Sequence, residues 1–275
     1  MAGDYREAVP LSVVGRDVWL LSNPEHVERL LRTDAAKFRK PYGDFPVMRA
    51  LVGNGMVASD GEFWLRQRRL AQPAFHKGRI ARYAETMHRL ATQTFATWRD
   101  GQTLDAHGAM MNLTLEVVAE CLFGTDLTRE SKVHGKVDTL MRLVHRQVAK
   151  AHPLLQALPT PTNRAYARAL DDLNVILNNL IRAQRTRGED DSLLSMLVNA
   201  KDDADVGMSD AQLLDELKTL FLAGYESSAN ALTWTMYLLM QHEKVLLELQ
   251  HEIDTMLHGQ PATSRPCRDC RSWTP

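Results

Sequence analysis

The sequence predicts a mainly α-helical protein with a small β-sheet element. Three observations carry this prediction: the chain has only 15 glycines and 11 prolines in 275 residues, its apolar residues recur at helical spacing over most of its length, and its one β-like segment is short. Hydrophobic residues make up 44% and charged residues 24% of the chain, which is ordinary for a folded globular protein. We expect residues 1–259 to form the N-terminal and central part of a single domain, and residues 260–275 to form an aberrant, unstructured tail.

The first element is a predicted β-hairpin. Two apolar runs, residues 9–14 and 18–21, lie on either side of the turn residues Gly15-Arg16-Asp17, as in two strands joined by a turn. A helix follows over residues 24–33. Its start is indicated by Asn23-Pro24, because asparagine caps helices well and proline suits their first turn.

Prolines and glycines mark residues 41–55 as irregular, and from Ser59 onward the pattern is helical almost throughout. Ser59 and Glu62 have the spacing of a capping box at the start of a helix over residues 60–71. The helices predicted after it cover residues 77–99, 107–123, 128–150, 163–187, 190–199, 209–241 and 242–258. Ser209 and Gln212 have the same capping-box spacing. The helix that they open is the longest, about 50 Å at 1.5 Å per residue.

The charge balance excludes several kinds of partner. The chain has 33 basic and 34 acidic residues and a formal net charge of −1, so it lacks the basic excess of a nucleic-acid binder. No apolar stretch approaches the ~20 residues of a membrane span, and nothing at the N-terminus resembles a signal peptide. We therefore expect a cytoplasmic protein with no membrane anchor that binds no nucleic acid.

The middle of the longest helix combines small and polar residues within an apolar segment. Gly224 should cost a helix interior about 1 kcal/mol relative to alanine, and Glu226 and Ser227 follow it directly. Polar groups are costly to bury without partners. This cluster therefore predicts a functional site or, as the alternative, close helix–helix packing at small residues with Glu226 in solvent.

Two strings in the sequence resemble motifs of one known family. Phe221-Leu222-Ala223-Gly224-Tyr225-Glu226-Ser227-Ser228 is similar to the central-helix signature of the cytochrome P450 family, Ala/Gly-Gly-x-Asp/Glu-Thr/Ser. Upstream, Trp64-Leu65-Arg66-Gln67-Arg68 resembles the family's Trp-x-x-x-Arg helix. The motifs occur in the family's order, and the resemblance extends over roughly residues 4–260.

The resemblance implies a haem-dependent monooxygenase, an oxidoreductase that acts on paired donors with O₂. Such an enzyme inserts one oxygen atom into an apolar small molecule, with electrons from a ferredoxin, a flavodoxin or a reductase. The implied cofactor is haem, iron protoporphyrin IX. The proline-rich segment 152–161, a predicted loop, resembles the family's substrate-access lid, and its leucines suit an apolar substrate.

The resemblance also assigns roles to six residues. Trp64 and Arg68 would bind the haem propionates, because an indole N–H and a guanidinium are both hydrogen-bond donors. Ala223 and Gly224 would line the distal face of the haem, where missing side chains leave room for the porphyrin and dioxygen. The implied catalytic residues, which would deliver protons to bound oxygen, are Glu226 and Ser227, the latter in place of the usual threonine.

Two other family motifs have no match in the sequence: the Glu-x-x-Arg helix and the cysteine loop whose thiolate binds the haem iron. Cys121 is expected to be a buried small hydrophobe. Cys267 and Cys270 form a lone Cys-x-x-Cys pair without a second pair for zinc, and we predict no metal ligand in this chain. We expect a C-terminally truncated family member that is inactive as this chain, with a tail from outside the ancestral reading frame.

Two alternatives remain open from the sequence. One is a non-catalytic helical remnant that binds no haem, and the other is a small metal module built on Cys267 and Cys270. The ten histidines include no His-Glu-x-x-His pair, so they do not favour a metal site elsewhere.

Overall fold

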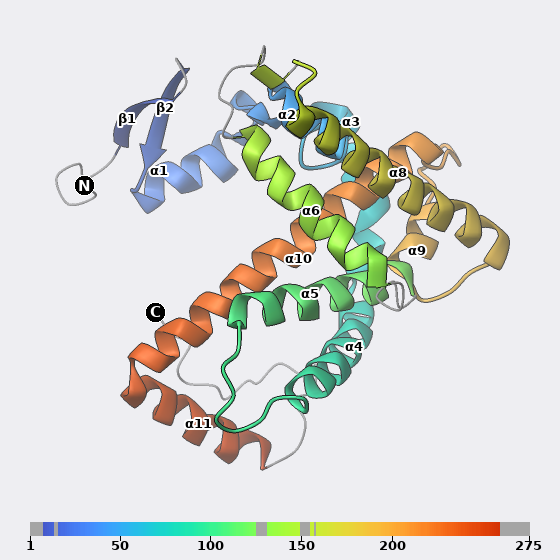
Figure 1. The fold of residues 1–275 in the computed structure, drawn as a ribbon. Coiled ribbons are helices and arrows are strands. Elements are labelled where there is room, and N and C mark those ends of the chain that lie inside the picture. The colour runs from blue at the N-terminus through green and yellow to red at the C-terminus, as the bar shows by residue number, and fades with distance from the viewer. Residues whose placement is uncertain (1–7, 14–15, 125–130, 149–154, 157, 259–275) are drawn as a thin grey trace.

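The computed structural model describes residues 8–13, 16–124, 131–148, 155–156 and 158–258. These residues form a set of packed helices with a two-stranded sheet at one corner (Figure 1). The predicted mainly helical class with a small β element is confirmed. The predicted tail with Cys267 and Cys270 lies outside the described residues, as does part of the predicted loop over residues 152–161.

The sheet is the predicted antiparallel hairpin of β1 (Ala8–Val13) and β2 (Arg16–Leu21). The predicted turn is wrong in its second half, since Arg16 pairs with Val13 and Asp17 with Ser12 in the ladder. Asp17 is exposed, so it can pair through its backbone while its charge stays in solvent. The hairpin therefore extends further towards its connection than the sequence pattern indicated.

Helix α1 (Pro24–Glu28) continues as a π-helical segment over Arg29–Thr33. Its predicted cap is confirmed, because Asn23 Oδ1 accepts a hydrogen bond from the backbone N–H of Glu25 at 2.8 Å. Helix α2 (Pro46–Val52) lies in the region predicted to be irregular. It has only seven residues, too few for a helical period to stand out among the surrounding prolines and glycines.

The remaining helices follow the predicted order, with ends that differ by a few residues. They are α3 (Gly61–Ala71), α4 (Lys77–Phe95), α5 (Ala106–Phe123), α6 (Ser131–Val148), α8 (Pro161–Arg187), α9 (Leu193–Asn199), α10 (Asp210–Gln241) and α11 (Glu243–Leu257). Among these described helices, none combines the length and the apolarity needed to cross a bilayer.

Of the two N-caps that the capping boxes predict, one is confirmed and one is wrong. Ser209 caps α10 as predicted, with its Oγ accepting from Gln212 N at 3.2 Å. At α3, however, the N-cap is Asp60 rather than Ser59, and no side-chain cap hydrogen bond forms. The Asp60 carboxylate instead accepts the backbone N–H of Lys40 at 2.7 Å, so a tertiary contact takes the place of the local one.

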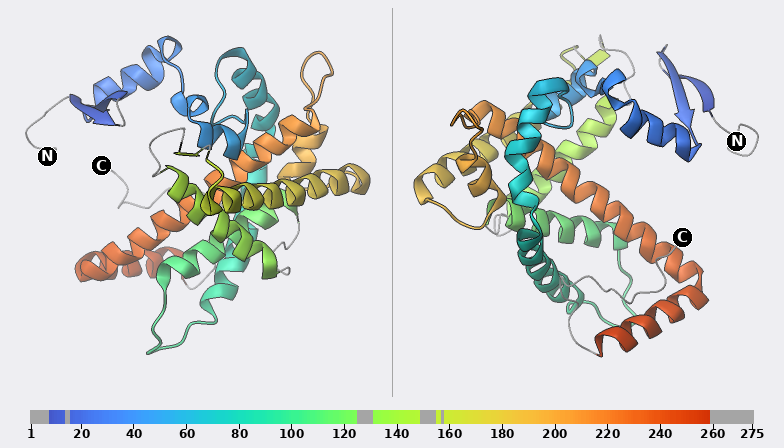
Figure 2. Two further views of the ribbon diagram at one scale, coloured as in Figure 1. Left: turned by 45° about the horizontal axis from the view of Figure 1, so that its top comes forward. Right: turned by 180° about the vertical axis from the view of Figure 1, so that it is seen from behind.

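Helix α10 crosses the whole molecule and organises its core (Figure 2). It packs along α5 and also contacts α2, α8, α9 and α11. Its first half is buried through Leu213, Leu217, Phe221 and Tyr225. The residues packed around them come from α5 and α8 and include Leu115, Ala119, Leu122, Leu173, Leu177 and Ile181.

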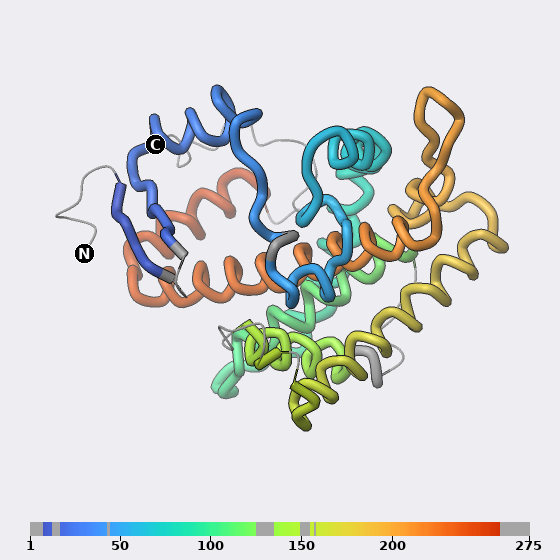
Figure 3. Tube along the Cα trace, turned by 90° about the horizontal axis from the view of Figure 1, so that it is seen from above, coloured from blue at the N-terminus to red at the C-terminus, as the bar shows by residue number. Residues whose placement is uncertain are grey.

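The second half of α10 is exposed on much of its surface and extends beyond α6 and α8 (Figure 3). Trp234, Tyr237 and Leu238 lie on one face of this half, and Trp234 is 62% exposed. Helix α11 adds further exposed apolar side chains, which are Val245, Leu247, Ile253 and Met256. Exposed apolar side chains in this number on two neighbouring helices favour association with other apolar surfaces.

We expect the purified chain to bind hydrophobic dyes and to self-associate through this surface. Replacing Trp234, Tyr237 and Leu238 with lysine will lower dye fluorescence and favour the monomer, as measured by size-exclusion chromatography with light scattering. Lysine at Ile80 and Val175, which are exposed on separate helices, serves as the control. A wild-type chain that is monomeric and binds no dye would contradict this expectation.

Candidate functional site

The two predicted propionate-binding residues lie together on α3. The Arg68 guanidinium carbon lies 5.3 Å from the centroid of the Trp64 ring, as expected for side chains four residues apart on a helix. Trp64 is half-buried and Arg68 is exposed. Arg68 forms no ion pair with any carboxylate among the residues that the structure describes, so its charge is open to an anionic ligand.

A third basic residue, Lys40, also packs on this ring and was missed from the sequence. Its Nζ lies 4.8 Å from the Trp64 ring centroid and donates hydrogen bonds to Met56 O at 2.7 Å and Ser59 O at 3.0 Å. Burial lowers the pKa of Lys40, and the charge of Arg68 lowers it further. No local signal could have found Lys40, because it lies in a loop far from Trp64 in sequence.

The predicted residues of α10 present small side chains on an open side of the helix. Ala223 and Ser227 are exposed and lie one turn apart. The Ser227 hydroxyl donates to Ala223 O at 2.6 Å, and the Ser228 hydroxyl donates to Gly224 O at 2.8 Å. The hydroxyls of Thr233 and Thr235, later on α10, also donate to the backbone carbonyl four residues before them.

Gly224 lies where α10 comes closest to α5. A Cβ at this position would be 3.1 Å from Val118 Cγ2, which is tighter than ordinary van der Waals contact. One residue further on, Thr114 Oγ1 of α5 donates to Tyr225 O at 3.0 Å. The glycine therefore permits close packing of the two helices, the alternative that the sequence left open for this position, while Ala223 remains on the open side.

Glu226 lies beside a histidine of another helix. Its Oε1 is 3.2 Å from His145 Nε2 on α6, with the Glu226 side chain 27% exposed and that of His145 65% exposed. The carboxylate is thus partly shielded and has a basic partner that reaches solvent. The sequence indicated Glu226 but not His145, since the pair forms only where α6 crosses α10.

A second buried carboxylate, Glu216, lies further back on α10. Glu216 is fully buried, and its Oε2 accepts the backbone N–H of Met56 at 3.0 Å while Oε1 accepts Gln212 Nε2 at 3.1 Å. Burial raises the pKa of Glu216 to about 7, against the opposing effect of these hydrogen bonds. Sequence reasoning missed this residue, because a single glutamate in an amphipathic helix carries no signal of burial.

The remaining cysteine and histidine residues do not build a metal centre in the described part of the chain, where no group of three or more potential ligands gathers. Cys121 is partly buried, and burial raises the pKa of its thiol to about 11. A protonated thiol is a poor metal ligand. This environment agrees with the expected small hydrophobic role of Cys121.

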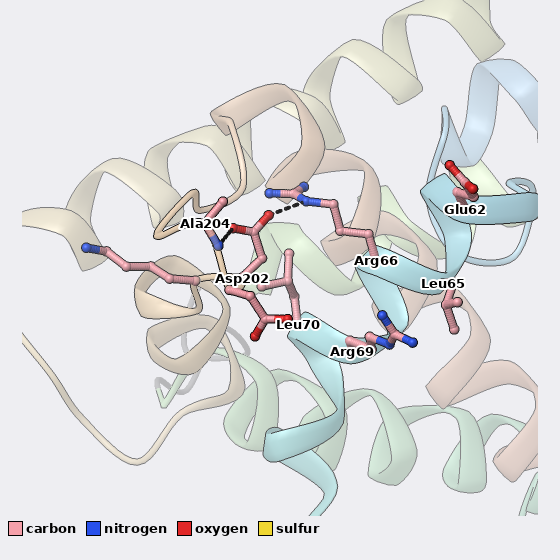
Figure 4. Close-up of a pocket in the computed structure, with 9 residues that line it drawn as sticks. Glu62, Leu65, Arg66, Arg69, Leu70, Asp202 and Ala204 are labelled. Carbon is pink, nitrogen blue, oxygen red and sulfur yellow. Dashed lines mark hydrogen bonds and ion pairs between the residues drawn. The ribbon is translucent and has the colours of Figure 1, made fainter.

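A surface pocket of about 520 Å³ lies between α3 and the turn before α10 (Figure 4). Arg66 Nε donates to Asp202 Oδ2 at 2.7 Å across it, and the other end of the guanidinium donates to Val206 O at 3.0 Å. Arg66 and Asp202 neutralise each other's charges, and their ion pair links α3 to the turn. The pocket lies on a different side of α3 from Arg68, which follows Arg66 by two residues.

The helical fold, the Trp64–Arg68 pair and the small, polar centre of α10 define the class of protein. The sequence profile of the family described as "Cytochrome P450" matches residues 1–272. The chain belongs to the cytochrome P450 family.

Two curated relatives come from Streptomyces. Cyclooctatin synthase of Streptomyces melanosporofaciens is 34% identical over 261 residues, which cover 93% of this chain and 57% of the relative. Pentalenene oxygenase of Streptomyces avermitilis is 32% identical over 260 residues, 94% of this chain and 58% of the relative. The chain therefore spans less than two thirds of the length of these relatives.

A solved structure shows the same fold. The haem domain of cytochrome P450DA superimposes with a TM-score of 0.79 at 24% identity, over 93% of this chain and 57% of that one. The predicted cytochrome P450-like fold is thus confirmed for the part of the chain that the structure describes.

Proposed function

We propose that this chain carries the propionate-binding and proton-handling side chains of a cytochrome P450 monooxygenase, which inserts one atom of O₂ into an apolar small molecule. The observation that carries the proposal is the cationic face of α3, which we define as Trp64 and Arg68 of α3 together with Lys40 of a preceding loop. Both cations lie over the Trp64 ring, and Arg68 lacks a carboxylate partner among the described residues. Two positive charges and an indole N–H suit the two carboxylates of haem. The donor set therefore fits the group that the family implies.

When bound, haem supplies the iron that binds and activates dioxygen. Trp64 and Arg68 would hold its propionates by hydrogen bonds and charge. Ala223 and Gly224 would line its distal face, where the exposed position and small size of Ala223 leave room beside α10. Burial raises the pKa of the Cys121 thiol to about 11, so this partly buried residue would not suit binding of the haem iron.

Proton handling is proposed for Glu226 and Ser227. Glu226 would hold a proton at its carboxylate, supported by its partly shielded position and its contact with His145. Ser227 would donate at Oγ after its hydroxyl leaves the carbonyl of Ala223, to which it is bonded at 2.6 Å. A hydroxyl that exchanges one acceptor for another can relay a proton without moving the helix.

The substrate class and partners follow from the family and remain proposals. Pentalenene oxygenase is named for an oxygenation of pentalenene. An apolar substrate also suits Leu155 and Leu158, which are half-exposed within the predicted lid. Electrons would come from a ferredoxin, a flavodoxin or a reductase. We also propose a cytoplasmic location, and the expectation that the 275-residue chain is itself inactive stays a prediction.

Titration of the purified chain with haemin tests this function against the alternative of a helical remnant that binds none. We expect saturable binding with a shifted Soret band. Arg68→Ala will weaken it about tenfold, because a charge-assisted hydrogen bond contributes about 1.5 kcal/mol or more. Arg69→Ala, at an exposed arginine on another side of α3, is the control and will bind like wild type. No saturable binding by wild type would favour the remnant.

A further inference from the structure

We propose that Glu216 of α10 is a positioning residue for the cationic face of α3, acting on Trp64 through Met56 and Lys40. The inference rests on the proposed function, because it concerns how that face meets the carboxylates of haem. It adds a residue from a distant helix that touches neither the indole nor the ligand. The connection consists of consecutive contacts, each of which is described below.

The first contact joins α10 to the strap, which we define as residues 53–60 between α2 and α3. Glu216 Oε2 accepts the N–H of Met56 at 3.0 Å, and the neighbouring Asp215 Oδ2 accepts the N–H of Asn54 at 2.8 Å. The strap approaches α10 so closely that a Cβ on Gly55 would lie 2.6 Å from Asp215 O. Two adjacent carboxylates of α10 therefore hold the strap by its backbone.

The second contact joins the strap to Lys40. Met56, which donates to Glu216, also accepts from Lys40 Nζ through its carbonyl at 2.7 Å. Ser59 O accepts from the same ammonium at 3.0 Å, and Asp60 accepts the Lys40 backbone N–H at 2.7 Å. The Lys40 ammonium is thus held by two carbonyls of the strap, and Glu216 binds the backbone N–H of one of these residues, Met56.

The third contact joins Lys40 to Trp64. The ammonium lies over the indole at 4.8 Å from the ring centroid, with Arg68 at 5.3 Å from the same centroid. Two like charges on one ring repel each other, and the carbonyls of Met56 and Ser59 hold the Lys40 ammonium in place against this repulsion. The negative charges of Asp60 and Glu216 also attract the ammonium. Glu216 therefore contributes both an acceptor and a charge to the orientation of Trp64.

The test compares two variants of the full chain and two porphyrins. Glu216→Met keeps the length of the side chain but removes its acceptor, whereas Glu216→Gln keeps an acceptor for Met56 N–H. Haemin carries two free carboxylates, and haemin dimethyl ester carries none. We expect Glu216→Met to weaken haemin binding about tenfold and to leave ester binding unchanged, and Glu216→Gln to restore most of the affinity for haemin.

Two controls separate positioning from loss of structure. Asp215→Asn retains an acceptor for Asn54 on the same strap and will keep the wild-type preference for haemin. Hydrogen exchange of the 54–60 segment, measured without porphyrin, will be faster in Glu216→Met and unchanged in Glu216→Gln. Helical circular dichroism should be the same in all variants.

Each result decides the matter. If Glu216→Met weakens the binding of haemin and of its dimethyl ester equally, or keeps the full preference for haemin, the positioning role is wrong while the proposed function stands. If the wild-type chain binds haemin and the ester with equal affinity, or binds neither, the carboxylate-binding face itself is wrong. That second result overturns the proposed function together with this inference.

Discussion

Replacing Glu216 with glutamine will stabilise the chain at pH 8 and have much less effect at pH 5. Burial raises the pKa of Glu216 from 4.5 to about 7 in the folded protein, so the folded state binds a proton more tightly than the unfolded state does. Between these two pKa values the stability of the wild type falls as pH rises, and above pH 7 the full cost of the buried charge is present. That cost is about 3 kcal/mol for a shift of this size.

Glutamine carries no charge at any pH and retains an acceptor for Met56, so this variant avoids the cost. Urea unfolding at the two pH values measures the difference, and we expect the gap between variant and wild type to widen by about 2.5 kcal/mol from pH 5 to pH 8. Glu248→Gln, at an exposed position on α11, provides the control and should show no such widening. A gap that is the same at both pH values would mean that Glu216 is not held at a raised pKa.

Gly55→Ala will destabilise the chain by about 3 kcal/mol, at the upper end of overpacking substitutions. An added Cβ would overlap the Thr219 hydroxyl and lie 2.6 Å from the backbone oxygen of Asp215. A helix backbone cannot move aside as a flexible side chain can. The strap must therefore lift from α10, and the hydrogen bonds of Asn54 and Met56 will be strained with it.

Gly135→Ala is the matched control, since a Cβ on this α6 glycine meets nothing within 4 Å. It should stabilise the chain by up to about 1 kcal/mol, because alanine loses less backbone freedom on folding into a helix than glycine does. Denaturant midpoints of the two variants give the comparison, and hydrogen exchange of residues 53–60 locates the effect. Equal midpoints would show that the strap lies further from α10 than the structure has it.

The parts of the fold that sequence reasoning predicted depend on short-range spacing. The helices follow from a period of 3.6 residues, and the contact between Trp64 and Arg68 follows from their separation by one turn. Ser209 was identified as a cap because its partner, Gln212, is three residues away. The same rule failed at Ser59, where Asp60 took the N-cap position and bonded to Lys40 instead.

The parts that could not be predicted depend on contacts between distant segments. Lys40 Nζ donates to the carbonyl of Met56 in the strap, and the buried Glu216 accepts the N–H of the same residue, so both contacts depend on where the strap lies. His145 meets Glu226 in the same way, where two helices cross. A sequence pattern shows which face of a helix is apolar, but it does not show which polar residue on that helix will lose contact with water.

The hydroxyls along the second half of α10 affect how this long helix can deform. The carbonyls of Ala223, Gly224, Ala229 and Ala231 each accept a side-chain hydroxyl from four residues later. Such a carbonyl keeps a hydrogen-bond donor, the hydroxyl, even when the backbone N–H of its own turn moves away. This half can therefore open a turn without leaving a carbonyl oxygen without a donor. We infer that α10 is rigid where Leu213 and Leu217 are packed and is more easily deformed where the serines and threonines begin.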